Sequence, residues 1–145
     1  MIRISTRGRY ALRAMVDLAL HANGGPVLRR DIARRQGISA DYVAQLFRRL
    51  CAVGLVDGVK GPGGGYVLAR APVAISAGDV VRAVEGPVAV VQCALPTDEP
   101  SCNRVDRCAT HLLWKRLSET ITEFLDLVTL QDLCDEARQL DRKEK

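Results

Sequence analysis

Three cysteines and one histidine within 19 positions form a set that could bind a metal centre. Thiolates and imidazoles are ligands both of zinc sites and of iron–sulfur clusters. Zinc sites usually contain two cysteines separated by two to four residues, and this C-x8-C-x5-C-x2-H set has no such pair. The wide spacing therefore favours an iron–sulfur cluster, whose irons separate the ligands, and leaves structural zinc as an alternative. The candidate ligands are Cys93, Cys102, Cys108 and His111.

The five cysteines do not suggest a secreted disulfide framework, because their number is odd and no export segment is apparent. Disulfide pairing within the candidate set would leave one thiol unpaired and would need an oxidising compartment. Cys51 and Cys134 lie at helical positions among apolar neighbours, so we expect both to be core thiols and not ligands.

A second group of polar residues is predicted to contact DNA. Residues 28–36 and 39–51 have helical patterns joined by a turn at Gly37, which is a helix-turn-helix arrangement. The exposed face of the second helix carries side chains that suit base edges and phosphates. Taken one at a time, each of these residues could instead be an ordinary solvent-exposed side chain. We expect Tyr42 and Gln45 to contact bases, and Ser39 and Arg48 or Arg49 to contact phosphates.

A hairpin is predicted to follow this helix pair. Two β-prone runs, 55–59 and 66–69, flank the glycine-rich residues 60–65. A hairpin in this position is a wing, and Lys60 at its tip could enter a minor groove. A phosphate-binding loop is disfavoured, because a tyrosine and a strand follow the glycines instead of a lysine, a serine or threonine and a helix.

The remaining elements would position these residues. A first helix is expected over residues 10–21, and Ser76 and Asp79 form a capping-box pattern before another short helix. The stretch 85–106 has no sustained periodicity, which is typical of a functional loop. A long helix then carries an apolar stripe that must be buried against the N-terminal domain or a second subunit. Its members are Leu113, Leu117, Ile121, Phe124 and Val128.

Charge is divided unequally along the 145 residues. Residues 1–70 contain 12 Lys and Arg against 4 Asp and Glu, whereas residues 71–145 contain 9 against 13. A basic N-terminal half is expected to meet a polyanion such as DNA. With 48% hydrophobic residues and no apolar run of membrane-spanning length, we expect a folded, cytoplasmic protein without membrane association. No catalytic triad, carboxylate pair or nucleotide fingerprint is apparent, so no enzyme is predicted.

The motifs together resemble the Rrf2 family of bacterial transcription regulators, over about residues 1–135. The resemblance is carried by STRGRYA at 5–11, DIARRQGIS at 31–39, GPGGGY at 61–66, and the Cys/His set followed by LLW at 112–114. It implies a mainly α fold with a small β-hairpin, in which a winged helix-turn-helix domain is joined to a long dimerisation helix. It also implies a homodimer that binds double-stranded DNA as a repressor or activator.

By the same resemblance, each subunit would hold one [2Fe-2S] cluster on Cys93, Cys102, Cys108 and His111, and the regulator would control genes of cluster assembly. The expected organisation is a DNA-binding domain over 1–84, a cluster-binding loop over 85–111, dimerisation helices over 112–140 and a mobile tail over 141–145. Ala44 departs from the pattern, because cluster-binding members of the family carry Glu at that position of the recognition helix. The first two cysteines are also further apart than in those members.

Overall fold

The N-terminal helix α1 (Thr6–Leu20) begins at Ser5, whose side chain accepts a hydrogen bond from the Gly8 N–H. The computed structural model describes residues 1–97 and 102–144. Met15 and Leu18 on the inner face of α1 are fully buried and form the centre of the core. The helix therefore starts one turn earlier than its apolar pattern predicted, because the cap lies upstream of the first buried residue.

The predicted helix-turn-helix is confirmed. Helix α2 (Arg29–Gln36) ends at Gly37, whose φ of 67° is the left-handed conformation that glycine adopts without strain. Ser39 then caps helix α3 (Ala40–Ala52), which buries four side chains in its inner stripe. These are Val43, Leu46, Phe47 and Leu50.

The wing is a three-stranded antiparallel sheet and not only a hairpin. Strands β2 (Val56–Val59) and β3 (Gly65–Leu68) pair as predicted, with Val56 opposite Leu68. A two-residue strand, β1 (Val27–Leu28), pairs with the other edge of β3 and gives the order β1-β3-β2. The sequence pattern placed Leu28 in the following helix, because two residues are too few to show strand periodicity.

Helix α4 (Ala77–Glu85) has the predicted capping box, in which Ser76 and Asp79 each bind the other's backbone N–H. Its buried residues pack mainly on α1. The chain then enters an irregular segment, residues 86–108, whose described part contains the short 3-10 turns Gln92–Ala94 and Val105–Arg107. These turns place the candidate ligands beside the next helix.

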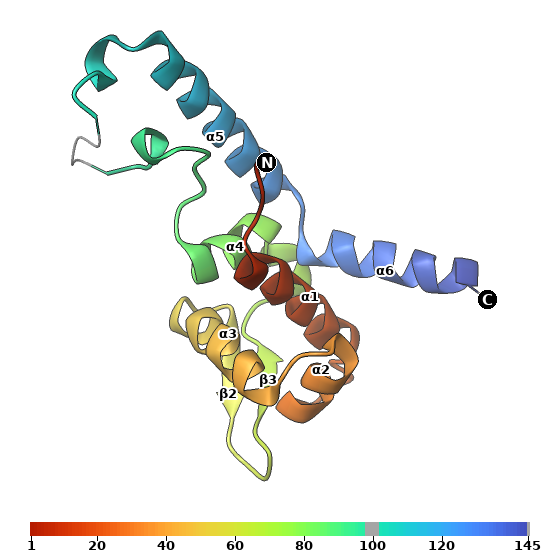
Figure 1. Cartoon of the computed structure of the whole chain (residues 1–145). Helices are drawn as coiled ribbons and strands as arrows, with labels where there is room; N and C mark the ends of the chain where they lie inside the picture. Colours follow the sequence, from red (N-terminus) through yellow and green to blue (C-terminus); the bar gives the residue numbers. More distant parts are fainter. Residues whose placement is uncertain (98–101, 145) are drawn as a thin grey trace.

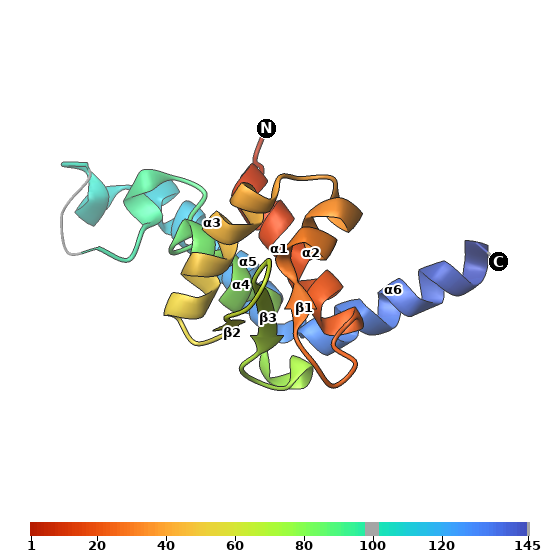
Figure 2. The same ribbon diagram turned by 90° about the horizontal axis from the view of Figure 1, so that it is seen from below.

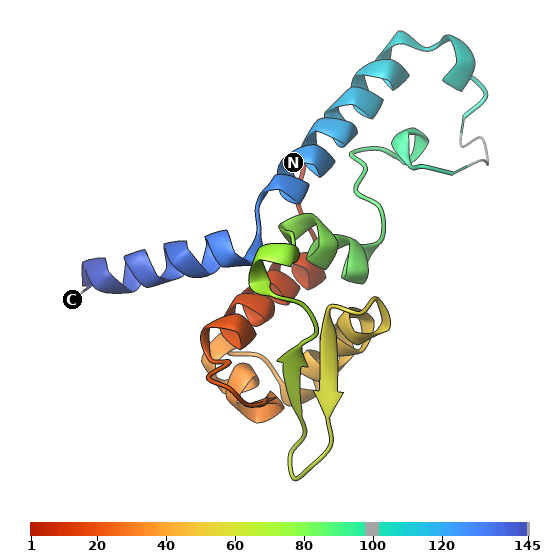
Figure 3. The ribbon, with the colours of Figure 1, turned by 180° about the vertical axis from the view of Figure 1, so that it is seen from behind.

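Two long helices complete the chain. Helix α5 (Ala109–Leu127) extends away from the winged domain, and α6 (Leu130–Glu144) leaves in another direction after packing its first turns on α1 (Figures 1 and 3). Helix α6 includes residues 141–144 of the tail that is predicted to be mobile. Asp132 in the first turn and Arg142 and Lys143 in the last turn complement the helix dipole. Lys145 lies outside the described residues.

The mainly α winged-helix architecture predicted from the sequence is confirmed. Seen from below, the sheet and α3 lie close together (Figure 2), and both lie at the end of the molecule opposite α5 (Figure 1). Within the described residues, no helix has the length and apolar character needed to cross a membrane.

Candidate metal centre and nucleic-acid interface

The four candidate ligands surround one small cavity between the irregular segment and the start of α5. Cys93 lies in the first 3-10 turn, Cys102 precedes the second, Cys108 is the N-cap of α5 and His111 lies in its first turn. The cavity has a volume of about 220 Å³, and its lining includes all four together with Val91, Val105, Thr110 and Trp114. The structure thus brings together the residues that the spacing singled out.

One ring nitrogen of His111 is buried. Its Nδ1 atom is buried and has no hydrogen-bond partner among the described residues. Leaving a buried polar atom unsatisfied costs about 1–3 kcal/mol. A neutral imidazole nitrogen is a good metal ligand, so a metal centre in the cavity would satisfy this atom. The donor set therefore fits a metal or a cluster.

The thiol of Cys108 has a hydrogen-bond partner two positions further along the chain, Thr110. The Thr110 hydroxyl lies 3.0 Å from Cys108 Sγ. Hydrogen bonds from this hydroxyl and from the His111 backbone stabilise the thiolate, and they lower the pKa of Cys108 below its ordinary value. The thiolate is the form that binds metals.

The cavity is open in this arrangement of the chain. Cys102 is exposed, whereas Cys93, Cys108 and His111 are half-buried. Within residues 1–97 and 102–144, no three His, Cys, Asp or Glu side chains are placed to hold one metal ion. Ligation by all four donors would therefore require the segment to tighten against α5.

The other two thiols are core residues, as predicted. Cys134 is 2% exposed and belongs to the main core, and the half-buried Cys51 packs against that core. Burial raises the pKa of both thiols. Both therefore stay protonated at neutral pH, which is unfavourable for metal binding.

The candidate base contacts lie on the solvent-facing side of α3. Ser39 Oγ accepts the Tyr42 N–H at 3.0 Å, so a phosphate contact from Ser39 would use its hydroxyl hydrogen. The half-buried Tyr42 ring lies edge-on to Tyr10, with their centroids 6.0 Å apart. Gln45 is exposed. Tyr42 and Gln45 thus stay predicted base contacts, with Tyr42 fixed in position by packing.

The two neighbouring arginines of α3 have different surroundings. Arg49 Nη1 donates to the Val84 carbonyl oxygen on α4 at 3.0 Å. Arg48 is exposed and has no ion pair among the described residues. Arg48 is therefore the better candidate for a phosphate, and Arg49 connects the recognition helix to the end of α4.

Lys60 is exposed at the end of β2, where the wing protrudes from the side of the domain opposite α5 (Figures 1 and 3). The wing and α3 are near each other in the fold, because β2 follows α3 directly in the chain. The ring of Phe47 on α3 also stacks on the ring of Tyr66 on β3, with their centroids 4.2 Å apart. This placement is suited to contacts in adjacent grooves of a duplex.

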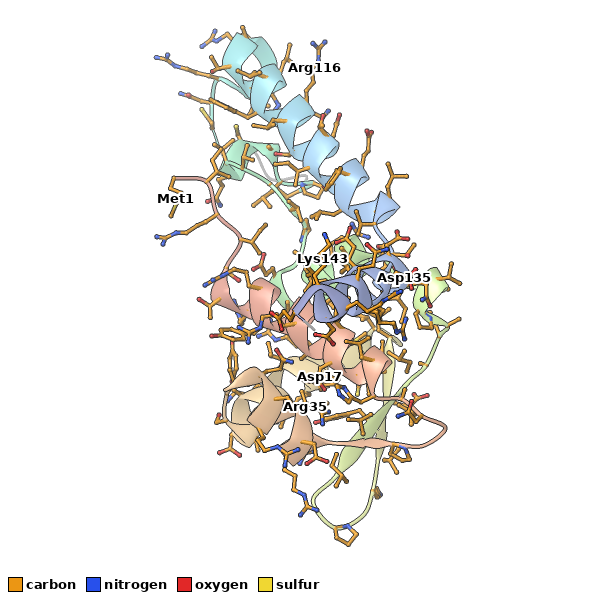
Figure 4. All side chains as sticks on the ribbon, turned by 90° about the vertical axis from the view of Figure 1, so that its right-hand side faces the viewer. Met1, Asp17, Arg35, Arg116, Asp135 and Lys143 are labelled. Carbon is orange, nitrogen blue, oxygen red and sulfur yellow. The ribbon has the colours of Figure 1, made fainter. Side chains whose placement is uncertain are left out.

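An ion pair that the sequence analysis did not identify joins α1 to the helix-turn-helix. Asp17 is 3% exposed, and its carboxylate accepts hydrogen bonds from Arg35 and from Gln36 Nε2, the latter at 2.8 Å. Figure 4 shows Asp17 and Arg35 side by side. The available signal was a charged residue between Met15 and Leu18 on the buried side of α1.

A second ion pair joins α4 to α5. Arg82 Nη2 lies 2.7 Å from Asp126 Oδ1 and 3.2 Å from Asp79 Oδ1. The hydrogen bond that Arg82 donates to Asp126 is the largest cause that raises the pKa of Arg82. A methyl group on Gly78 would collide with the Asp126 carboxylate. Arg82 also lines a groove of about 910 Å³ whose lining includes Cys93 and His111, so this joint lies next to the candidate metal centre.

Comparisons with known proteins agree with this architecture. A family model described as Rrf2, iron-dependent transcriptional regulator, matches residues 4–136. The HTH-type transcriptional regulator IscR of Erwinia tasmaniensis is 48% identical over 132 residues, which cover 91% of this chain and 78% of that protein. IscR of Pectobacterium carotovorum is 46% identical over 140 residues, which cover 97% and 84%.

Two solved structures are similar in fold and in sequence. CymR, described as the global cysteine regulator of B. subtilis, has a TM-score of 0.73 and 39% identity, covering 94% of this chain and 98% of its own. IscR of T. potens has the same score and identity, covering 93% and 88%. Since regulators with different names share this fold, the fold alone does not identify the effector, and the donor set must do so.

Proposed function

Because this chain belongs to the Rrf2 family of transcriptional regulators, we propose that it is a homodimer whose DNA binding responds to a [2Fe-2S] cluster. Family membership establishes a DNA-binding transcription regulator and not an enzyme. The proposal adds the cluster, its ligands and the dimer. The observation that carries it is the buried Nδ1 of His111, which has no partner among residues 1–97 and 102–144 and lies in a cavity also lined by three cysteines.

Three thiols and one imidazole would hold the cluster. Cys93, Cys102 and Cys108 would bind as thiolates, and His111 would bind through its neutral imidazole. When bound, such a cluster supplies a centre that is lost or oxidised when iron, sulfide or redox conditions change. The hydrogen bond with the Thr110 hydroxyl, 3.0 Å from Cys108 Sγ, is the largest cause that lowers the pKa of Cys108, and this favours the thiolate that binds a metal.

Cluster binding would order residues 93–108 against α5. The chain just before that segment is already attached to the helix, since the Val90 N–H donates to Ser118 Oγ at 3.0 Å and Ser118 is 4% exposed. Closure of the cavity would add a bond from each of the four ligands to the metal centre, which would lie beside Cys108 and His111 at the start of α5. The loop would then be held at both ends.

Two contacts could pass this ordering to the DNA-binding elements. Glu85, the last residue of α4, accepts hydrogen bonds from the backbone N–H groups of Ser5 and Gly8 at the start of α1, at 3.0 and 3.2 Å. Arg49 of α3 donates a hydrogen bond to the Val84 carbonyl oxygen at the same end of α4. The beginning of the cluster loop is thus attached to both α1 and the recognition helix.

A second copy of the chain would cover the apolar face of α5. Leu113, Phe124 and Leu127 are 54%, 65% and 78% exposed, and their spacing places them on one side of the helix. Because α5 extends away from the winged domain, that domain does not cover this face (Figure 1). Pairing with α5 of the partner would bury it, and large exposed apolar patches mark such interfaces.

The dimer would present two recognition helices and two wings to one duplex. We expect a palindromic site whose half-sites lie about 34–36 Å, or a multiple of that distance, apart. Ser39, Tyr42, Gln45 and Arg48 would make the contacts of α3, and Lys60 those of the wing. We further propose genes of iron–sulfur cluster assembly as targets, as the family resemblance implies.

Anaerobic purification tests the cluster directly. The wild-type protein should be coloured and contain two irons and two sulfides per chain. Cys93→Ala, Cys102→Ala and Cys108→Ala should each remove the colour, whereas Cys51→Ala and Cys134→Ala serve as controls and should keep it. Colourless protein with one zinc per chain would show a zinc-stabilised regulator instead.

A further inference from the structure

An open hollow lies where the strands of the wing meet its glycine-rich turn, separate from the candidate metal centre. It has a volume of about 620 Å³ and is lined mostly by glycines. Its charged lining side chains are Arg29, the first residue of α2, and Lys60, and no carboxylate lines it. A hollow of this composition is suited to an anion.

The Arg29 side chain is held in one orientation by the wing. Its Nε donates to the Tyr66 hydroxyl at 2.9 Å, and its guanidinium carbon lies 5.4 Å from the Tyr66 ring centroid. Tyr66 is 5% exposed and stacks on Phe47 of the recognition helix. Arg29 is therefore fixed relative to α3 through a single buried ring.

Gly64 leaves the space that the guanidinium occupies. A Cβ atom at Gly64 would lie 2.9–3.1 Å from Nη2, the central carbon and Nη1 of Arg29. The Arg29 backbone N–H also donates to the Gly64 carbonyl at 3.1 Å. The flat face of the guanidinium thus lies against the wing backbone. Within residues 1–97 and 102–144, Nη1 and Nη2 have no hydrogen-bond or ion-pair partner.

We propose that Arg29 binds a backbone phosphate of duplex DNA beside the glycine-rich turn of the wing, through Nη1 and Nη2. A guanidinium with two free Nη groups matches the geometry of a phosphate and can bind two of its oxygens. Because Tyr66 and Gly64 already fix the side chain, little rotamer entropy is lost on binding. The inference rests on DNA binding by this domain and does not depend on the cluster.

A phosphate is favoured over a base edge because Arg29 is half-buried and its guanidinium lies against the wing backbone at Gly64. The exposed Lys60 is the side chain placed to enter a groove, so the strand backbone beside that groove would lie over the hollow. Arg29 of α2 would then bind a phosphate, and Lys60 of the hairpin would contact the adjacent groove.

Ethylation interference on a bound duplex tests this placement. For the wild type, one phosphate in each half-site beside the wing should block binding when ethylated. Arg29→Gln should lose interference at that phosphate and keep it at the phosphates contacted by α3, which also shows that the variant is folded. An unchanged interference pattern in Arg29→Gln would overturn the proposal, as would a wild type that does not bind duplex DNA.

The salt dependence of binding supplies an independent measurement. Arg29→Gln should lower the slope of log K against log salt by about 1.8 for a dimer that loses two phosphate contacts. Lys143→Gln at the far end of α6 changes net charge equally and should leave the slope unchanged. Tyr66→Phe keeps the charge but removes the hydroxyl that orients Nε, so affinity should fall several-fold at an unchanged slope. Equal slopes for Arg29→Gln and wild type would contradict the assignment.

Because these measurements use wild type and variants in the same cluster state, they separate this proposal from that of the cluster. Loss of DNA binding on cluster removal would leave the difference between Arg29→Gln and wild type intact when both carry the cluster. A protein that binds DNA equally with and without the cluster would still show the Arg29 effect.

Discussion

The carboxylate of Asp17 on α1 accepts hydrogen bonds from both Nε and Nη2 of Arg35 on α2, with Oδ1 and Nη2 2.7 Å apart. The Asp17 side chain is 1% exposed, so the carboxylate depends on these partners in place of water. The pair fixes the first helix of the helix-turn-helix against the core, and the recognition helix is positioned from there.

Arg35→Ala should therefore destabilise the protein by about 3 kcal/mol, because it leaves a buried carboxylate without its main partner. Urea unfolding of cluster-free protein would measure the change. Arg34→Ala is the matched control, since Arg34 is 74% exposed and lies 3.6 Å from Asp31, a pair worth at most about 0.5 kcal/mol. Equal effects of the two substitutions would show that the Asp17 pair does not stabilise the fold.

Gly78→Ala should also destabilise the protein, although Ala at an open helix position gains up to about 1 kcal/mol over Gly. The added methyl group would collide with the Asp126 carboxylate and displace it from Arg82. We expect a net loss of about 1–3 kcal/mol and a lower Tm in thermal unfolding. Gly25→Ala, which has open space around the added atom, should leave Tm unchanged or slightly higher. An unchanged Tm for Gly78→Ala would mean that α4 and α5 are not packed as described.

Much of the fold could be predicted from local patterns. Ser39, Gly37 and the stripe of α3 are separated by a few residues, so the sequence itself displays the cap, the turn and the buried face. The grouping of the donor set was also predictable, because Cys93 and His111 are only 18 positions apart in the sequence.

Contacts between distant residues could not be predicted in this way. Asp17 and Arg35 are 18 positions apart, and nothing in their spacing distinguishes them from solvated charges. Arg29 and Tyr66 are 37 positions apart and meet only because β1 pairs with β3. The opening of the cavity around Cys102 likewise depends on tertiary packing and not on periodicity.

Phe124→Asp should convert a dimer into monomers, because it places a charge in the centre of the apolar face of α5. Sedimentation equilibrium should give twice the 15.8 kDa of one chain for the wild type and the single-chain mass for the variant. Val73→Asp alters an equally exposed apolar residue, 67% exposed and outside α5, and should stay dimeric. A monomeric wild type would contradict the proposed α5 interface.

Ala44→Glu should narrow the set of DNA sites that the protein selects. Ala44 is half-buried and precedes Gln45 on α3, so a glutamate there would be repelled by phosphates and would accept hydrogen bonds only from a base donor such as cytosine N4. The expected discrimination is about 1–3 kcal/mol per base pair. Selection from random DNA with wild type and variant, each with and without cluster, would measure it. Identical preferences in all four samples would mean that residue 44 does not influence site choice.

The most direct test of the account is the affinity of one duplex site for the same protein with and without its cluster, measured without oxygen at fixed salt. We expect Kd values that differ at least about ten-fold, equivalent to 1.4 kcal/mol of coupling between the cavity and the recognition helices. Cys108→Ala, which cannot complete the ligand set, should show one Kd under both conditions, equal to that of the cluster-free wild type. Equal Kd values for the wild type with and without its cluster would contradict the proposed sensing function.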